Sequence, residues 1–150
     1  MSRNIFLRVL VMVVVVSGAL AAGWTAFGQQ SGFILIAHST VDQDSLAKEK
    51  ASDYFLKKDS RWDDGEEVKP VDLNLREVRE AFSSEVHNRS LTAIKKYWQR
   101  QIFTGRGTPP PEKGSAGEVI QYVSSTPGAL GYVPAGTKLP GDLVKVLRLR

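Results

Sequence analysis

Two short stretches of the sequence carry side chains with which a protein can hold a small anion. One is the polar trio that follows the apolar run "GFILIA", and the other lies where "PVDLNLREVREAF" passes from a strand into a helix. The first backbone N–H groups of a helix attract anions, and hydroxyl, amide, imidazole and guanidinium groups donate hydrogen bonds to them. The candidate ligand-binding residues are His38, Ser39, Thr40, Asn74, Arg76 and Arg79.

The charges around the second stretch oppose a tight anion site. Glu77 lies beside Arg76 in the expected first turn, and Asp72 precedes the helix. A helix dipole and a partly exposed guanidinium contribute about 0.3 to 1 kcal/mol each, whereas a micromolar site needs about 8 kcal/mol. We therefore expect a small anion to bind weakly or not at all. His38, at a strand end, has an alternative role in hydrogen bonding within its own loop.

The sequence shows no pattern typical of an enzyme or a metal site. The two histidines, His38 and His87, lie far apart, and there is no cysteine. The acidic cluster at 63–67 lacks the alternating ligands of a calcium loop, and a tight turn explains it better. The segment "TGRGT" lacks the lysine and hydroxyl pair of a P-loop, and the serine pairs have no base nearby. We expect no enzymatic activity, no cofactor and no metal.

Residues 1–28 have the pattern of an export signal. Arg3 and Arg8 make the start positive, and "VLVMVVVVSGALAA" is the apolar run. Signal peptidase would cleave after Ala21 or after Gly28. The alternative is an uncleaved membrane anchor, because the apolar run approaches the length that spans a bilayer. Residues 29–150 would then form one domain, which we expect in the periplasm.

The composition of the chain favours one compact domain without nucleic-acid binding. About 125 residues suffice for a single core, and a fold without cysteine has no disulfide to support it. The formal charge is +4, which includes the two arginines of the export signal, and acidic residues are interleaved with basic ones along the remainder of the chain. This mild basic excess is typical of a solvated surface, and no basic stripe indicates a nucleic-acid partner.

Hydrophobic periodicity predicts alternating strands and helices, which favours an α/β layer with a partly parallel sheet. The expected helix caps are Ser45, Asn74 and Ser90 at N-termini and Gly105 at a C-terminus. Expected strands cover 32–39, 67–74, 129–134 and 142–150, and expected helices cover 46–56, 75–87, 91–103 and 116–126.

The order of residues from Phe33 to about Pro134 resembles the substrate-binding proteins of phosphate ABC transporters. The most specific parts are the turn "WDDG", the segment "YWQRQIFTGRG" with its following prolines, and "TPGALGYVP". The resemblance implies a type II periplasmic-binding-protein fold, in which two lobes close over the ligand. This chain has the length of one lobe. The implied fold is a single three-layer α/β lobe with a mixed, mostly parallel sheet flanked by helices.

The family's anion loop has no counterpart in this chain. In the family, a segment of the form Arg-Ser-x-Gly-Ser-Gly-Thr precedes the helix that here carries Phe82. Counting back from Phe82 places the run 76–78, "REV", where the Ser-Gly-Thr end would be, and Asp72 where the arginine would be.

The resemblance implies an exported periplasmic solute-binding-type protein in which phosphate binding is weak or lost. The alternative is a structural or regulatory interaction protein that docks a protein partner, or a second copy, through an exposed sheet edge or the face that would meet the missing lobe. Trp62, Trp98 and Tyr132 are aromatic candidates for such a face, with core packing as the alternative for each. A membrane would be contacted only through an uncleaved N-terminus.

Overall fold

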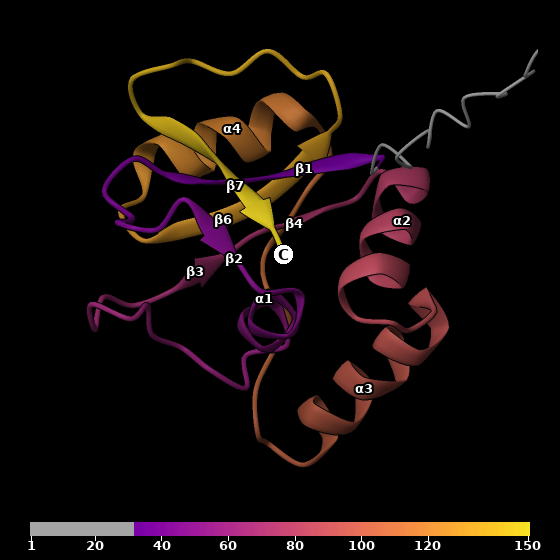
Figure 1. The fold of residues 1–150 in the computed structure, drawn as a ribbon. Coiled ribbons are helices and arrows are strands. Elements are labelled where there is room, and N and C mark those ends of the chain that lie inside the picture. The colour runs from indigo at the N-terminus through magenta and orange to yellow at the C-terminus, as the bar shows by residue number, and fades with distance from the viewer. Residues whose placement is uncertain (1–31) are drawn as a thin grey trace, which may run out of the picture.

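The computed structural model describes residues 32–150 (Figure 1), and the expected signal peptide or anchor lies outside this range. Within residues 32–150, no helix is long and apolar enough to cross a membrane. The helices are α1 (Lys48–Phe55), α2 (Arg76–Val86), α3 (Leu91–Phe103) and α4 (Ala116–Ser125). The strands are β1 (Phe33–His38), β2 (Ser45–Leu46), β3 (Lys69–Pro70), β4 (Asp72–Leu73), β5 (Glu112–Lys113), β6 (Ala129–Pro134) and β7 (Val144–Leu149).

A mixed five-stranded sheet with the order β2-β7-β1-β6-β3 forms the centre of the fold. The central strand β1 is antiparallel to both β6 and β7, while β2 pairs with β7 and β3 with β6 in parallel. Strands β4 and β5 form a separate parallel pair. The α/β class and the mixed sheet are confirmed, but the expectation of a mostly parallel sheet is wrong. Parallel pairing is confined to the two-residue strands, so the longest ladders are antiparallel.

Helices cover both faces of the sheet, which gives the expected three layers (Figure 1). Successive residues of a strand point to opposite faces, and β6 shows this clearly. A Cβ at Gly131 would lie 2.9 Å from Val119 of α4, whereas the ring of Tyr132 stacks 3.9 Å from that of Phe82 in α2. Helix α4 therefore packs on one face, and α1 and α2 pack on the other.

The core is built around an aromatic cluster on the α2 side of the sheet. Phe82 contacts Phe33 and Phe55 edge to face, at centroid distances of 5.2 and 4.7 Å. Trp62 and Tyr132 are buried, so both are core residues and not parts of an exposed face. Trp98 is only half-buried. Within residues 32–150, the buried residues of the core cluster extend from Phe33 to Leu147.

Two of the four predicted helix caps are wrong. Ser45 belongs to β2, and Ala47 precedes α1 without a side-chain cap. Asn74 also lies one residue too early, because Leu75 is at the cap position of α2. In both places the backbone pairs with a distant strand: Ser45 is in register with Arg148 of β7, and the N–H of Asn74 donates to the carbonyl of Lys113. Long-range pairing therefore displaces the local cap.

The other two caps are confirmed. The side chain of Ser90 accepts a hydrogen bond from the N–H of Ala93, and α3 covers 91–103 as predicted. Gly105 has a φ of 67°, the left-handed conformation that favours glycine after a helix. The expected strand at 67–74 divides at Val71 into β3 and β4, which belong to different sheets.

Candidate functional site

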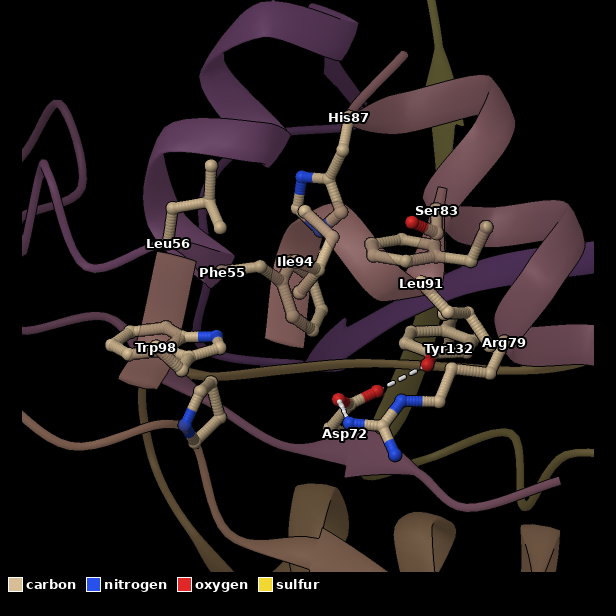
Figure 2. Close-up of a pocket in the computed structure, with 12 residues that line it drawn as sticks. Phe55, Leu56, Asp72, Arg79, Ser83, His87, Leu91, Ile94, Trp98 and Tyr132 are labelled. Carbon is tan, nitrogen blue, oxygen red and sulfur yellow. Dashed lines mark hydrogen bonds and ion pairs between the residues drawn. The ribbon is translucent and has the colours of Figure 1, made fainter. Parts of the chain in front are cut away.

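Arg79 lies between two carboxylates at the start of α2. Its Nη2 is 2.7 Å from Oδ2 of Asp72 and 2.7 Å from Oε1 of Glu112. The hydroxyl of Tyr132 donates a hydrogen bond to the other oxygen of Asp72 (Figure 2). Only 23% of the Arg79 side chain and 18% of the Asp72 side chain are exposed. One cation thus faces two anions, and the cluster as a whole repels a further anion.

The parallel pairing of β4 with β5 places the two carboxylates side by side. Asp72 and Glu112 are opposite each other in the register of this pair. Arg79 then reaches both from the first turn of α2, which follows β4 directly. Neither Glu112 nor Tyr132 was among the candidate ligand-binding residues, because they join the cluster from distant segments and no local pattern marks them as anion ligands.

Burial governs the titration of this cluster. Desolvation raises the pKa of Asp72 above its ordinary value, and the charge of Arg79 and the hydrogen bond from Tyr132 oppose that rise. Burial, and then the charge of Asp72, raise the pKa of Tyr132. The phenol therefore keeps its proton at neutral pH and acts as a hydrogen-bond donor to the carboxylate.

A small cavity lies beside the ion pair, between α1, α2, α3 and the sheet (Figure 2). Its volume is about 20 Å³, which is room for one water molecule. The polar groups at its edge already have partners: the Ser83 hydroxyl donates to the carbonyl of Arg89, and Nδ1 of His87 lies 2.8 Å from Oγ of Ser52.

The first predicted stretch lies on the other face of the sheet. On β1, Leu35 is opposite Tyr132 and Ile36 is opposite Gly131. By strand alternation His38 shares the face of Ile36, away from the Tyr132 cluster. Its Nδ1 lies 2.9 Å from Oγ1 of Thr40 and accepts the Thr40 backbone N–H at 3.1 Å. The alternative role of His38, hydrogen bonding within its own loop, is the one that the structure shows.

The remaining candidates are exposed and turn to other partners. Ser39 donates its backbone N–H to the carbonyl of Leu143. Asn74 is exposed, and Arg76, with 86% of its side chain exposed, pairs with Glu80 of the next helical turn at 2.9 Å. The structure therefore separates 38–40 from 74–79. It also directs Arg76 and Arg79 to different carboxylates, so that the six residues do not converge on one ligand. Whether any of them binds an anion stays a prediction.

A wider groove opens beside the ion pair, between α3 and the proline-rich segment after it. Its volume is about 450 Å³. Leu91, Ile94, Trp98 and Pro109 form mostly apolar walls, and the ion pair of Arg79 with Glu112 closes one end. Among residues 32–150 no group of three or more histidine, aspartate or glutamate side chains is placed to hold a metal ion.

Solved structures with the same fold are phosphate transport proteins. The chain is similar to a protein from Clostridium perfringens assigned as a phosphate ABC transporter substrate-binding protein and solved with bound phosphate, at 16% identity and a TM-score of 0.56. It is also similar to an ABC-type phosphate transport receptor from Vibrio cholerae, at 12% identity and a TM-score of 0.55. PstS from Borrelia burgdorferi shows 16% identity and a TM-score of 0.50.

The likeness extends over one part of each of these proteins. It covers 79% of this chain and 44, 46 and 47% of the three chains in turn, so this chain spans less than half of their length. No family model matches the chain, and no curated protein matches its sequence. At these identities the likeness establishes the fold, which is that of one lobe of a phosphate-binding protein. The resemblance found in the sequence is confirmed at this level.

Proposed function

We propose that residues 29–150 are an exported, periplasmic solute-binding-type domain, related to phosphate ABC transporter substrate-binding proteins, in which phosphate binding is weak or lost. The pattern of residues 1–28 supports export. The fold supports a relation to solute-binding proteins, and the proteins that share it are named for phosphate transport and not for catalysis. The same comparison supports a non-enzymatic role.

The observation that carries this proposal is the double ion pair of Arg79. An incoming phosphate would have to displace Asp72 or Glu112, each 2.7 Å from the guanidinium. It would also bring a negative charge into a cluster that already has an excess of one carboxylate. Charges attract and repel more strongly in a partly buried site than in water. This arrangement therefore opposes anion binding where the family resemblance expects it.

Isothermal titration of residues 29–150 with phosphate at low salt tests the proposal. We expect no saturable heat below millimolar phosphate. The variant Glu112→Gln removes one carboxylate while keeping the side-chain shape, and we expect it to bind phosphate more tightly than the unsubstituted domain. Micromolar binding that Arg79→Ala abolishes and Arg76→Ala preserves would overturn the proposal. No gain in Glu112→Gln would show that the Glu112 carboxylate is not the obstacle.

A second candidate function is the docking of a protein partner or a second copy through this lobe. The apolar groove beside Trp98 favours it, because mostly apolar concave surfaces are typical binding sites. Sedimentation equilibrium of residues 29–150 and of Trp98→Ala tests for a homodimer. A dimer that weakens in Trp98→Ala supports this candidate, and a monomer at all concentrations removes the second copy as the occupant.

A further inference from the structure

We propose that the exposed side of α3 and the loop after it dock the domain onto the surface of an anionic lipid bilayer. This inference goes beyond the proposed function and rests on only one part of it, the export of the chain to a membrane-bounded compartment. It is independent of phosphate binding. We call the docking region the α3 surface, and its residues are Lys95, Lys96, Arg100, Ile102, Phe103 and Arg106.

The charge of this part of the chain is strongly segregated. Residues 86–111 contain five basic side chains and no aspartate or glutamate. The expectation that acidic and basic residues are interleaved is therefore wrong for this segment. The basic residues of the α3 surface are all exposed, and none takes part in the ion pairs found within residues 32–150. Their charges are available to an external anion.

Two apolar side chains protrude among these charges at the C-terminal end of α3. Phe103 is 93% exposed and Ile102 is 55% exposed. Residues three, four or seven apart share one side of a helix, so Phe103 lies on the side of Lys96 and Arg100. By the same spacing Ile102 lies on the side of Lys95 and Trp98. The helix thus presents apolar groups surrounded by cations, which is the composition of interfacial membrane-binding helices.

The shape of the α3 surface favours a bilayer over a protein partner. Figure 1 shows α3 at the outer edge of the molecule, with the central sheet on its other side. A protein partner would need a matching pocket for the protruding Phe103 ring, whereas a fluid lipid interface accepts it without one. The negative potential of a bilayer is continuous and repels every acidic group nearby. The absence of acidic residues over the whole of 86–111 fits such a surface.

This inference departs from the expectation that a membrane is contacted only through the N-terminus. A single weak contact gives marginal, reversible membrane binding, and two contacts acting together give stable binding. If the N-terminal segment stays in the membrane, the α3 surface holds the domain against the same bilayer. If that segment is cleaved, binding through the α3 surface depends on salt and is reversible.

Vesicle sedimentation of residues 29–150 tests the inference. The probes are vesicles of phosphatidylcholine alone and vesicles that also contain phosphatidylglycerol. We expect binding to the anionic vesicles only, with loss of binding as salt is raised. Lys96→Glu/Arg100→Glu should reduce the partition coefficient by about tenfold or more. Each basic residue near an anionic surface adds to the free energy of membrane binding, and each substitution also introduces a repelled negative charge. Phe103→Ser should reduce it several-fold at every salt concentration.

A matched control separates the α3 surface from net charge. Lys138 and Arg148 are also exposed and make no ion pair within residues 32–150, so Lys138→Glu/Arg148→Glu changes the net charge equally. We expect this control to retain most of the binding. An equal loss in both double variants, equal binding to zwitterionic vesicles, or no binding at low salt would overturn the inference. Self-association without vesicles that Lys96→Glu/Arg100→Glu abolishes would assign the surface to a second copy.

The outcome of vesicle sedimentation does not depend on the outcome of the phosphate titration. Each variant is first tested for cooperative thermal unfolding, so that loss of vesicle binding is not a loss of folding. A domain that binds phosphate tightly and also binds anionic vesicles would contradict the proposed function and support the inference. A domain that binds neither phosphate nor anionic vesicles would support the proposed function and contradict the membrane-docking inference.

Discussion

Two regions of the molecule carry arginine side chains next to apolar groups. In one region carboxylates compensate the positive charge, and in the other they do not. At the start of α2, Arg79 is compensated by Asp72 and Glu112, each at 2.7 Å. On α3, Arg100 is exposed and makes no ion pair within residues 32–150. An external anion is attracted to positive charge that no carboxylate compensates. Anion attraction therefore lies on α3, and not at the start of α2 where the family resemblance expects it.

The same contrast holds for the phenylalanines of the two regions. Phe82 is 2% exposed and stacks on Tyr132, whereas Phe103 is 93% exposed. A side chain that stabilises the fold and one that is available to a partner can be told apart by mutation. Matched substitutions in the two regions should separate stability from surface function, and we order them by the size of the expected effect.

The largest expected effect is that of Phe82→Ala. Phe82 contacts the rings of Phe33 in β1, Phe55 in α1 and Tyr132 in β6. Removing a fully buried phenylalanine costs about 3 to 5 kcal/mol of unfolding free energy. Phe103→Ala should change that free energy by less than about 0.5 kcal/mol. Urea denaturation of residues 29–150 measures both. A comparable loss in Phe103→Ala would mean that the end of α3 supports the core, and the comparison would fail.

Arg79→Ala should have the next largest effect. It leaves the Asp72 carboxylate partly buried and without a cation, with the Tyr132 hydroxyl and the Leu73 backbone N–H as its hydrogen-bond donors. Removing one partner of a fully buried ion pair costs about 3 to 5 kcal/mol, and the remaining exposure of this pair reduces the expected loss to about 2 to 3 kcal/mol. The matched Arg100→Ala should stay within about 0.5 kcal/mol.

A double variant tests the reason for that loss. Asp72→Asn in the background of Arg79→Ala removes the uncompensated charge, and it should recover part of the lost stability. If the double variant is as unstable as the sum of the single variants, the two side chains do not act as a pair.

His87 should make the stability of the α2 region depend on pH. Burial, with smaller contributions from Arg89 and Lys58, lowers the pKa of His87 from 6.5 to about 4. Below pH 6.5 the unfolded chain binds a proton that the folded chain does not bind. Stability is therefore complete above about pH 6.5 and declines as the pH falls towards 4, by about 2 kcal/mol at pH 5.

The matched variant for this titration is His87→Asn. It should be less stable at neutral pH, and its unfolding free energy should change little between about pH 6.5 and 5, because most carboxylates titrate below that window. Urea denaturation at several pH values measures both slopes. Parallel slopes in the two proteins would show that His87 titrates in the folded state as it does in the unfolded state.

The sequence predicts the elements well where the signals are local. The Ser90 cap and Gly105 define α3, and the apolar run of β6 defines the strand at 129–134. Prediction fails where distant backbone pairs override a local signal. The pairing of β2 with β7 takes Ser45 away from its cap position, and the contact of Asn74 with Lys113 does the same for α2.

The candidate site is harder to predict than the fold, for the same reason. Arg79 and the opposing Asp72 are recognisable in the sequence, but Glu112 meets them only through the pairing of β4 with β5. Tyr132 reaches Asp72 only because β6 presents that residue towards α2. The acid-free segment 86–111 is visible in the sequence, yet an average over the whole chain conceals it. Whether this segment can bind an external anion depends on which of its basic side chains the fold leaves exposed.

The smallest expected effect comes from a pair of glycines, one in the core between the sheet and α4 and one in the loop after α3. A methyl group at Gly131 would lie 2.9 Å from both Val119 and Val71, so Gly131→Ala overpacks the layer between the sheet and α4. Overpacking costs about 1 to 3 kcal/mol, and the lower entropy of the unfolded chain returns about 0.4 to 1 kcal/mol. We expect a net loss of about 1 kcal/mol.

Gly107, in the loop after α3, should respond with the opposite sign. A Cβ there has no neighbour within 4 Å, so only the entropy of the unfolded chain changes. Gly107→Ala should therefore stabilise residues 29–150 by about 0.4 to 1 kcal/mol. Urea denaturation measures both variants. If the dependence of the unfolding free energy on urea concentration is unchanged, a lower midpoint in Gly131→Ala and a higher midpoint in Gly107→Ala show the loss and the gain of stability. A loss in Gly107→Ala would mean that the loop after α3 packs against the domain, and that part of the α3 surface would not be free to meet a bilayer.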